Sequence, residues 1–200
     1  PWREEVLSGL LGADLIGFHT FEYVTYFFNS VRRILGYEQE MTRIKAGDRQ
    51  VKVDTFPMGI DCRRFSGAVH DPRTEKEVAR IRQFVGTEKI ILSIDRLDYT
   101  KGVPLRLMAY DALLDNHPEL KEHVTFILVA VPSRTRIEQY SRLKHDVDQL
   151  VGRINGRHGT MCWIPVRYLF KSLPFNRLIA LYRISDIALI TPLRDGMNLM

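Results

Sequence analysis

Apolar side chains along this chain follow two kinds of spacing, one typical of helices and one typical of buried strands. Helical spacing, with apolar residues on one face, occurs over residues 2–11, 21–36, 73–85, 103–116, 135–152 and 174–185. Short apolar runs that predict strands occur over residues 13–20, 49–59, 89–95, 123–131, 160–166 and 186–193. Apolar strands that alternate with helices are typical of parallel sheets with helices on both faces. The sequence therefore predicts an α/β fold.

A run of turn residues, SGAVHDP at 66–72, separates two such regions and predicts a linker. We expect residues 1–65 and 73–200 to form two units, each with a parallel sheet covered by helices. The chain begins with Pro1 and ends on what reads as the first turn of a helix, so we expect an internal fragment in which both domains are incomplete.

The charge of the chain limits the classes of partner. Of its 200 residues, 29 are Lys or Arg and 24 are Asp or Glu, which gives a net charge of +5. The basic residues are scattered and form no block, so local anion sites are favoured over a nucleic-acid surface.

The two cysteines show no metal or disulfide spacing. No apolar run approaches the roughly 18 residues of a membrane span, and no signal peptide is evident, so we expect a cytoplasmic protein.

A first candidate site lies where the predicted strand 89–95 meets the next helix. Arg96 and Lys101 lie in this loop, and Gly102 lets the backbone approach a ligand closely. Helix N-termini favour anions, and two cations beside one suit a diphosphate better than a carboxylate. The competing interpretation is a pair of surface salt bridges to Asp95 and Asp98.

Two further loops follow predicted strands and should lie at the same edge of the sheet. One contains Asp195 and Gly196, followed by Met197, Asn198 and Leu199. Backbone N–H groups here could hold phosphate, and the Asp195 carboxylate could accept hydrogen bonds from sugar hydroxyls. The alternative is that Asp195 only caps a helix. The other loop contributes Arg134, which would otherwise be an ordinary surface arginine.

Six segments occur in an order that is highly specific when taken together. They are LLGADLIGFHT, FPMGID, DRLDYTKG, VPSRT, GRINGRHGT and TPLRDGMNL. This chain closely resembles the trehalose-6-phosphate synthases over essentially all of its length. These are retaining glycosyltransferases of family 20 with the two-domain GT-B fold. The resemblance implies that residues 1–65 form the C-terminal part of the N-terminal Rossmann-like domain, which binds the acceptor. Residues 73–200 would form the N-terminal part of the C-terminal Rossmann-like domain, which binds the nucleotide-sugar donor, with 66–72 as the linker.

The resemblance implies glucosyl transfer from UDP-glucose to glucose-6-phosphate, without a bound metal or other cofactor. Arg96 and Lys101 would be the catalytic pair, holding the donor diphosphate and offsetting the charge on the leaving UDP. Asp195 would contact the donor glucose, and Gly196, Met197, Asn198 and Leu199 would hold its phosphates through the backbone. The segment at Leu173 would contact uracil, and Arg134 would meet the acceptor phosphate.

The resemblance leaves alternatives open. A glucosylglycerol-phosphate synthase would use the same donor site with another acceptor, and most acceptor contacts would precede Pro1, so this stretch alone should be inactive. A non-catalytic, sugar-phosphate-sensing homologue is disfavoured because both Arg96 and Lys101 are retained. We expect no nucleic-acid or membrane partner, and the sequence leaves a homo-oligomer open.

Overall fold

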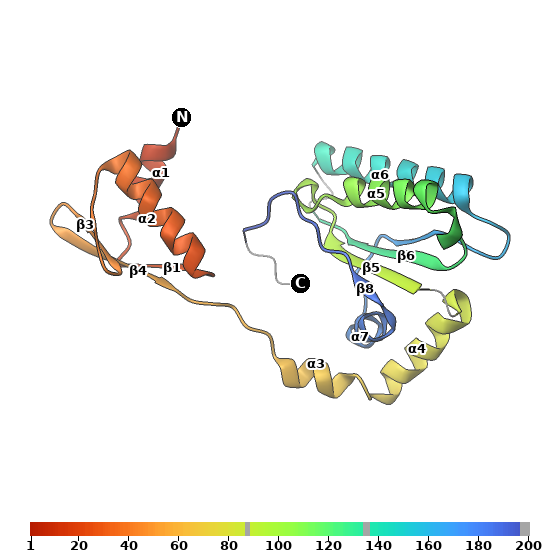
Figure 1. The fold of residues 1–200 in the computed structure, drawn as a ribbon. Helices are drawn as coiled ribbons and strands as arrows, with labels where there is room; N and C mark the ends of the chain where they lie inside the picture. Colours follow the sequence, from red (N-terminus) through yellow and green to blue (C-terminus); the bar gives the residue numbers. More distant parts are fainter. Residues whose placement is uncertain (87–88, 134–136, 197–200) are drawn as a thin grey trace. The chain divides into compact units, whose positions relative to one another are not determined.

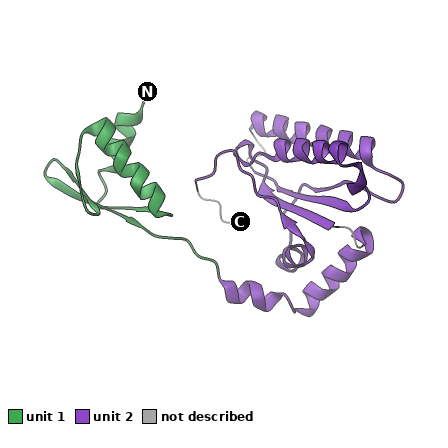
Figure 2. Cartoon of the chain, in the orientation of Figure 1, with its two compact units in different colours: residues 1–60, 199 green, residues 61–198, 200 purple. Residues whose placement is uncertain are grey.

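The computed structural model describes residues 1–86, 89–133 and 137–196, and the chain divides into two compact units (Figure 2). Unit 1 spans Pro1–Ile60 and unit 2 begins at Asp61. The linker expected at 66–72 lies after this division. It covers the end of helix α3 (Cys62–Ala68) and the first residue of helix α4 (Pro72–Val85).

Helix α3 belongs to unit 2 because its side chains pack on helix α7 (Phe175–Ile184). The rings of Phe65 and Phe175 meet edge to face with centroids 5.3 Å apart. The guanidinium of Arg64 lies 4.7 Å from the centroid of the same Phe175 ring. Aromatic and cation–π contacts of this kind favour a fixed position for the short helix.

Unit 1 contains two helices and a small mixed sheet. Its elements are α1 (Arg3–Leu10), β1 (Leu15–Phe18), α2 (Phe21–Leu35), β2 (Gln39–Glu40), β3 (Arg43–Ala46) and β4 (Arg49–Thr55). The strand order is β1-β4-β3-β2; β1 and β4 are parallel, as expected, but the other two pairs are antiparallel. Gly47 adopts a φ of 62° in the tight turn between β3 and β4, which makes the reversal possible.

Helix α2 shows how local sequence and packing agree in unit 1. Its N-terminus is capped by Thr20, whose side chain accepts a hydrogen bond from Tyr23 N at 3.4 Å, and it ends at Gly36 with a φ of 72°. Its apolar face packs with the sheet, and the buried residues are Val24, Phe27, Phe28, Val31, Ile44, Val51 and Val53. The predicted helix over 21–36 is confirmed.

Unit 2 contains an all-parallel sheet with the order β7-β6-β5-β8. After α3 and α4 its elements are β5 (Lys89–Arg96), the 3-10 helix η1 (Tyr99–Lys101), α5 (Val103–Asn116), the 3-10 helix η2 (Pro118–Leu120), β6 (Val124–Val131), α6 (Glu138–His158), β7 (Val166–Leu169), α7 and β8 (Ile187–Ala188). The predicted α/β fold is therefore confirmed.

Helices cover both faces of this sheet (Figure 1). On one face α5 and α6 pack against alternate strand residues such as Phe126 and Leu128. On the other face α4 and α7 pack against the intervening residues, such as Ile127 and Val129. Both sides of the central strands are buried, which explains their continuous apolar sequence.

Three predicted boundaries in unit 2 were wrong. Residues 160–165 form a loop, and β7 begins only at Val166. Helix α6 continues to His158 through Gly152 and Gly156, because Ile154 and His158 are buried and packing outweighs the low helix propensity of glycine. The strand expected over 186–193 is limited to Ile187–Ala188.

No helix within the described ranges is long and apolar enough to cross a membrane.

Candidate functional site

The carboxyl ends of the four parallel strands in unit 2 lie at one edge of the sheet, which is where ligands bind in such folds. Arg96 is the last residue of β5, and Lys101 lies in the loop that follows it. Leu173 follows β7, while Asp195 and Gly196 follow β8. The other predicted site residues, Arg134, Met197, Asn198 and Leu199, lie outside the described residues.

The loop between β5 and α5 is folded around the side chain of Asp98. One carboxylate oxygen of Asp98 accepts hydrogen bonds from Thr100 N at 3.0 Å and Thr100 Oγ1 at 2.9 Å. The other oxygen accepts a hydrogen bond of 2.9 Å from the hydroxyl of Tyr140. Gly102, with a φ of 67°, then turns the chain into α5. Asp98 therefore anchors the loop that carries Lys101.

The Lys101 side chain points into the protein, and the residue is only 8% exposed. Its Nζ contacts Asp195 Oδ2 and lies 3.5 Å from Asp95 Oδ1. The pairing with Asp95 was the competing interpretation from the sequence, but it is buried and not a surface salt bridge. The contact with Asp195 unites two of the three candidate loops.

Arg96 differs from Lys101 because its side chain is exposed. Among residues 1–86, 89–133 and 137–196, no hydrogen bond or ion pair engages its guanidinium. Its charge is thus available to an anion at the edge of the sheet, where it offers a planar fork for phosphate oxygens.

The loops that carry Lys101 and Asp195 are joined through their backbones. Thr100 O accepts hydrogen bonds from Leu193 N at 2.8 Å and from Arg194 N at 3.3 Å. A Cβ atom on Gly102 would lie 2.9 Å from Thr191 O, so the two backbones pack closely at this glycine. These contacts explain why the segment after Ala188 leaves the sheet and how Asp195 reaches Lys101.

The sequence reasoning missed Arg106, which lies on α5 beneath the loop and is 2% exposed. Its guanidinium donates to Asp95 Oδ2 at 2.6 Å, to Ser93 Oγ and to the carbonyl of Lys101. The signal was present as a charged residue among the apolar residues VPLRLMA at the start of the helix. Burying an unpaired charge costs free energy, so an arginine within an apolar helix segment predicts a buried partner of opposite charge.

Leu173, assigned to the uracil contact by resemblance, lies in the loop between β7 and α7. Its side chain is partly buried against the core formed by the sheet, α4 and α7. It thus lies at the same edge as Arg96 and Lys101, two strands away in the sheet order.

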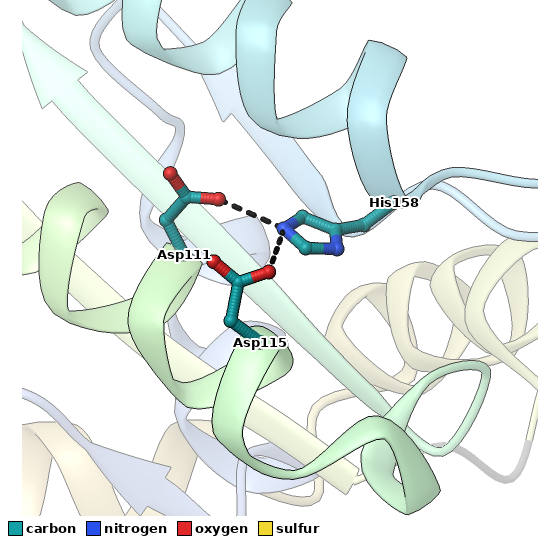
Figure 3. A group of neighbouring side chains, drawn as sticks. All are labelled: Asp111, Asp115 and His158. Carbon is teal, nitrogen blue, oxygen red and sulfur yellow. Dashed lines mark hydrogen bonds and ion pairs between the residues drawn. The ribbon is translucent and has the colours of Figure 1, made fainter.

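A second cluster of titratable side chains joins α5 to α6 (Figure 3). His158 Nε2 is hydrogen-bonded to Asp111 Oδ1 at 2.8 Å and lies 3.8 Å from Asp115 Oδ1. Of the described residues, this is the one group with three ligand atoms close enough to hold a metal ion.

Two arginines neutralise the carboxylates of this cluster. Arg153 pairs with Asp111 at 3.2 Å, and Arg157 pairs with Asp115 at 2.8 Å. A metal ion would have to displace or oppose both guanidinium groups, so we interpret the cluster as a salt-bridge network between two helices. Asp111 lies eight residues after the start of α5, about 12 Å along the helix from the candidate site.

The fold and the candidate site together define an α/β protein of the GT-B type, with cations at the carboxyl ends of a parallel sheet. The chain belongs to glycosyltransferase family 20, whose family model matches residues 1–200.

Known proteins resemble the chain over its whole length. It is 51% identical over 199 residues to the bifunctional trehalose-6-phosphate synthase/phosphatase of Thermoproteus tenax, covering 100% of this chain and 27% of that protein. The alpha,alpha-trehalose-phosphate synthase (UDP-forming) of Burkholderia xenovorans, solved in complex with glucose-6-phosphate, matches with a TM-score of 0.92 and 29% identity. An E. coli trehalose-6-phosphate structure bound with UDP-2-fluoro glucose matches with a TM-score of 0.91 and 30% identity.

Both structural matches cover 100% of this chain and 44% of the solved chain. The chain thus spans less than half the length of these relatives.

Proposed function

We propose that the full-length protein is a UDP-forming trehalose-phosphate synthase, which transfers glucose from UDP-glucose to glucose-6-phosphate with retention. The observation that carries this proposal is the partly buried contact between Lys101 and Asp195, in loops at the same edge of the sheet as the exposed Arg96. This arrangement supports the proposal, because two cations would suit a diphosphate and the neighbouring carboxylate would suit sugar hydroxyls. The ligands of the two solved relatives, glucose-6-phosphate and UDP-2-fluoro glucose, support the choice of substrates.

In this proposal Arg96 and Lys101 bind the donor diphosphate and are the catalytic residues. Negative charge increases on the β-phosphate oxygen as the bond to the anomeric carbon breaks. The buried ammonium of Lys101 and the guanidinium of Arg96 would both stabilise that charge, and the lysine acts where water is largely excluded. Lys101 is oriented by Asp95 and by the loop anchored at Asp98, so little reorganisation is needed once a donor phosphate has replaced Asp195 as its partner.

The remaining predicted residues would contact the donor, except Arg134, which would contact the acceptor. Asp195 would accept hydrogen bonds from hydroxyls of the donor glucose, and the backbone from Gly196 to Leu199 would hold the phosphates. Leu173 would contact the uracil base through its backbone. Arg134 would meet the phosphate of the acceptor.

The reaction itself breaks the bond between the anomeric carbon and the UDP oxygen and forms a bond from that carbon to the acceptor hydroxyl oxygen. We propose that the acceptor's proton passes to the departing phosphate on the same face of the sugar, so that the configuration is retained. No second protein carboxylate is then required, in contrast to glycoside hydrolases.

We further propose that the reaction needs no metal ion, because Arg96 and Lys101 supply the positive charge that a cation would otherwise bring to the diphosphate. The protein would work in the cytoplasm on soluble phosphorylated sugars, without nucleic-acid or membrane partners. Self-association into a homo-oligomer is compatible with this function.

The decisive experiment measures UDP release by the full-length protein with UDP-glucose and either glucose-6-phosphate or glycerol-3-phosphate. Release only with glucose-6-phosphate supports the proposal. Release with glycerol-3-phosphate instead would keep the donor site but assign the protein to glucosylglycerol-phosphate synthesis. Release with neither acceptor would contradict the proposed reaction and favour a sugar-phosphate-sensing role.

A further inference from the structure

We propose that Arg106 is a positioning residue that keeps the charge of Lys101 available to the donor diphosphate by neutralising Asp95. This inference rests on the proposed function and extends it to a residue that does not reach the substrate. The side chains of Arg106 and Asp95 are only 1% and 2% exposed. They therefore act on the reaction only through Lys101 and the loops beside it.

The two oxygens of the Asp95 carboxylate have different partners. Oδ2 accepts a hydrogen bond from Arg106 at 2.6 Å, whereas Oδ1 lies 3.5 Å from Lys101 Nζ. The closer partner of Asp95 is thus the arginine, and the lysine is held at a longer distance. A charge-assisted hydrogen bond at 2.6 Å is a strong one, while 3.5 Å is at the limit of hydrogen bonding.

Among the described residues, Arg106 supplies the buried positive charge that offsets the buried carboxylate of Asp95. Asp95 and Asp195 bring two negative charges, and Lys101 brings one positive charge. Without Arg106 the lysine would face two carboxylates, which would weaken the attraction of the site for a diphosphate. With Arg106 the charge of Asp95 is compensated, so Lys101 needs to exchange only Asp195 for a phosphate oxygen.

Arg106 also fixes the backbone on both sides of the candidate site. Its guanidinium donates to the carbonyl of Lys101 and lies 3.5 Å from the carbonyl of Leu189, just after β8. One side chain therefore links the loop that carries Lys101 to the segment that leads to Asp195. Such a fork of donors on a rigid plane is specific to arginine.

The test compares Arg106→Gln, Arg106→Lys, Asp95→Asn and the double variant Asp95→Asn Arg106→Gln in the full-length protein. Glutamine retains a hydrogen-bond donor but removes the charge, so Asp95 turns to Lys101. We expect kcat to fall by about tenfold or more, less than the 10²–10³ expected for loss of a direct donor. Arg106→Lys keeps the charge but loses the planar fork of donors, so its activity should lie between those of Arg106→Gln and the original protein.

The double variant distinguishes charge compensation from a general structural role. Removing Asp95 together with Arg106 leaves no uncompensated carboxylate, so kcat and the affinity for UDP should rise again to within about threefold of the original protein. A folded double variant that is no more active than Arg106→Gln would overturn the proposal. So would an Arg106→Lys variant that is folded and as impaired as Arg106→Gln.

UDP binding measured by calorimetry separates this proposal from the proposed function. If the unmodified full-length protein released no UDP with either acceptor, the proposed reaction would be wrong. The effect of the Arg106 variants on the affinity for UDP would still test whether Arg106 keeps Lys101 available. If Arg106→Gln did not fold, the double variant would decide. Affinity for UDP near that of the original protein supports charge compensation, and a loss of more than about tenfold contradicts it.

Discussion

The ammonium of Lys101 contacts the carboxylate of Asp195, a residue 94 positions further along the chain. The contact joins the loops that follow two neighbouring strands, β5 and β8. Each group thereby has a partner of opposite charge in a site where water is largely excluded. A phosphate of the donor would have to replace Asp195 as the partner of Lys101. The hydroxyls of the donor sugar could then replace Lys101 as the partners of Asp195. The following predictions concern the full-length protein.

Asp195→Asn should weaken the binding of UDP-glucose while leaving the affinity for free UDP unchanged or higher. The substitution removes an acceptor of sugar hydrogen bonds but also frees Lys101 from a competing anion. Calorimetric titration with UDP and with UDP-glucose checks this difference. An equal loss of affinity for both ligands would argue against a sugar contact by Asp195.

Arg96→Ala should reduce kcat by about 10²–10³-fold, because it removes one of two cations that stabilise the leaving diphosphate. The melting temperature should change by less than about 2 °C, since the side chain is exposed and packs into no core. UDP release and thermal unfolding check the two effects. Arg80→Ala is a matched control, because Arg80 is also exposed and pairs only weakly with Glu77 at 4.0 Å. Near-normal turnover of Arg96→Ala would remove Arg96 from the catalytic pair.

Gly102→Ala should destabilise the protein and also lower its activity. A side chain at a φ of 67° costs about 1–2 kcal/mol, and its Cβ would meet Thr191 O at 2.9 Å. The two loops would be pushed apart, which would separate Lys101 from Asp195.

Gly152→Ala in α6 provides the matched control for this glycine substitution. Its added Cβ would meet no atom within 4 Å beyond the neighbouring backbone of its own helix, and the residue is inside a helix. The free energy of unfolding of the Gly152→Ala variant should rise by about 0.5–1 kcal/mol, and its activity should be unchanged. Denaturant unfolding measures the change in the free energy of unfolding, which should be negative for Gly102→Ala and positive for Gly152→Ala. A stabilised Gly102→Ala variant would contradict the tight packing described at this loop.

Chelation of divalent metals with EDTA should leave the rate of UDP release unchanged, because side-chain cations are proposed to stabilise the diphosphate. The Asp111–Asp115–His158 cluster is charge-balanced by Arg153 and Arg157 and lies away from the site. Activity with and without EDTA, followed by addition of magnesium, checks the expectation. A loss on chelation that magnesium restores would show that the donor site needs a metal.

The salt bridge between Glu77 on α4 and Arg177 on α7 should make stability depend on pH. Arg177 donates to both Glu77 oxygens, at 2.8 and 3.1 Å, and these hydrogen bonds lower the pKa of Glu77. Since the pKa is lower in the folded than in the unfolded state, the stabilisation is complete above the ordinary pKa of glutamate. It is lost as the pH falls through the lowered value.

Glu77→Gln should therefore cost about 1 kcal/mol near neutral pH, and the difference from the original protein should vanish in acid. Denaturant unfolding at several pH values measures this difference. Glu138→Gln is the control, because Glu138 pairs with Arg142 on an exposed face of one helix, and its loss should cost only about 0.3–0.5 kcal/mol. A Glu77→Gln difference that persisted in acid would show that packing, and not charge, is responsible.

Much of the fold was predictable because local rules and burial agree in many segments. Thr20 and Gly36 mark the ends of α2 by their capping chemistry, and the apolar runs of β5 and β6 reflect burial on both sheet faces. The prediction was wrong where tertiary packing outweighs local preference. Gly152 and Gly156 lie inside α6 because neighbouring side chains are buried. The antiparallel pairing of β3 and β4 has a local cause, the turn at Gly47, which the expectation of a parallel sheet overlooked.

The sequence by itself also determined which loops carry the candidate chemistry, because the carboxyl ends of parallel strands must share an edge. It placed Arg96, Lys101 and Asp195 there without specifying their contacts. Only the tertiary structure decided that Lys101 is buried between Asp95 and Asp195, that Arg96 is exposed, and that Arg106 compensates Asp95. The reason is physical: periodicity reports which side of an element is buried, whereas the pairing of buried charges depends on distances between residues far apart in the chain.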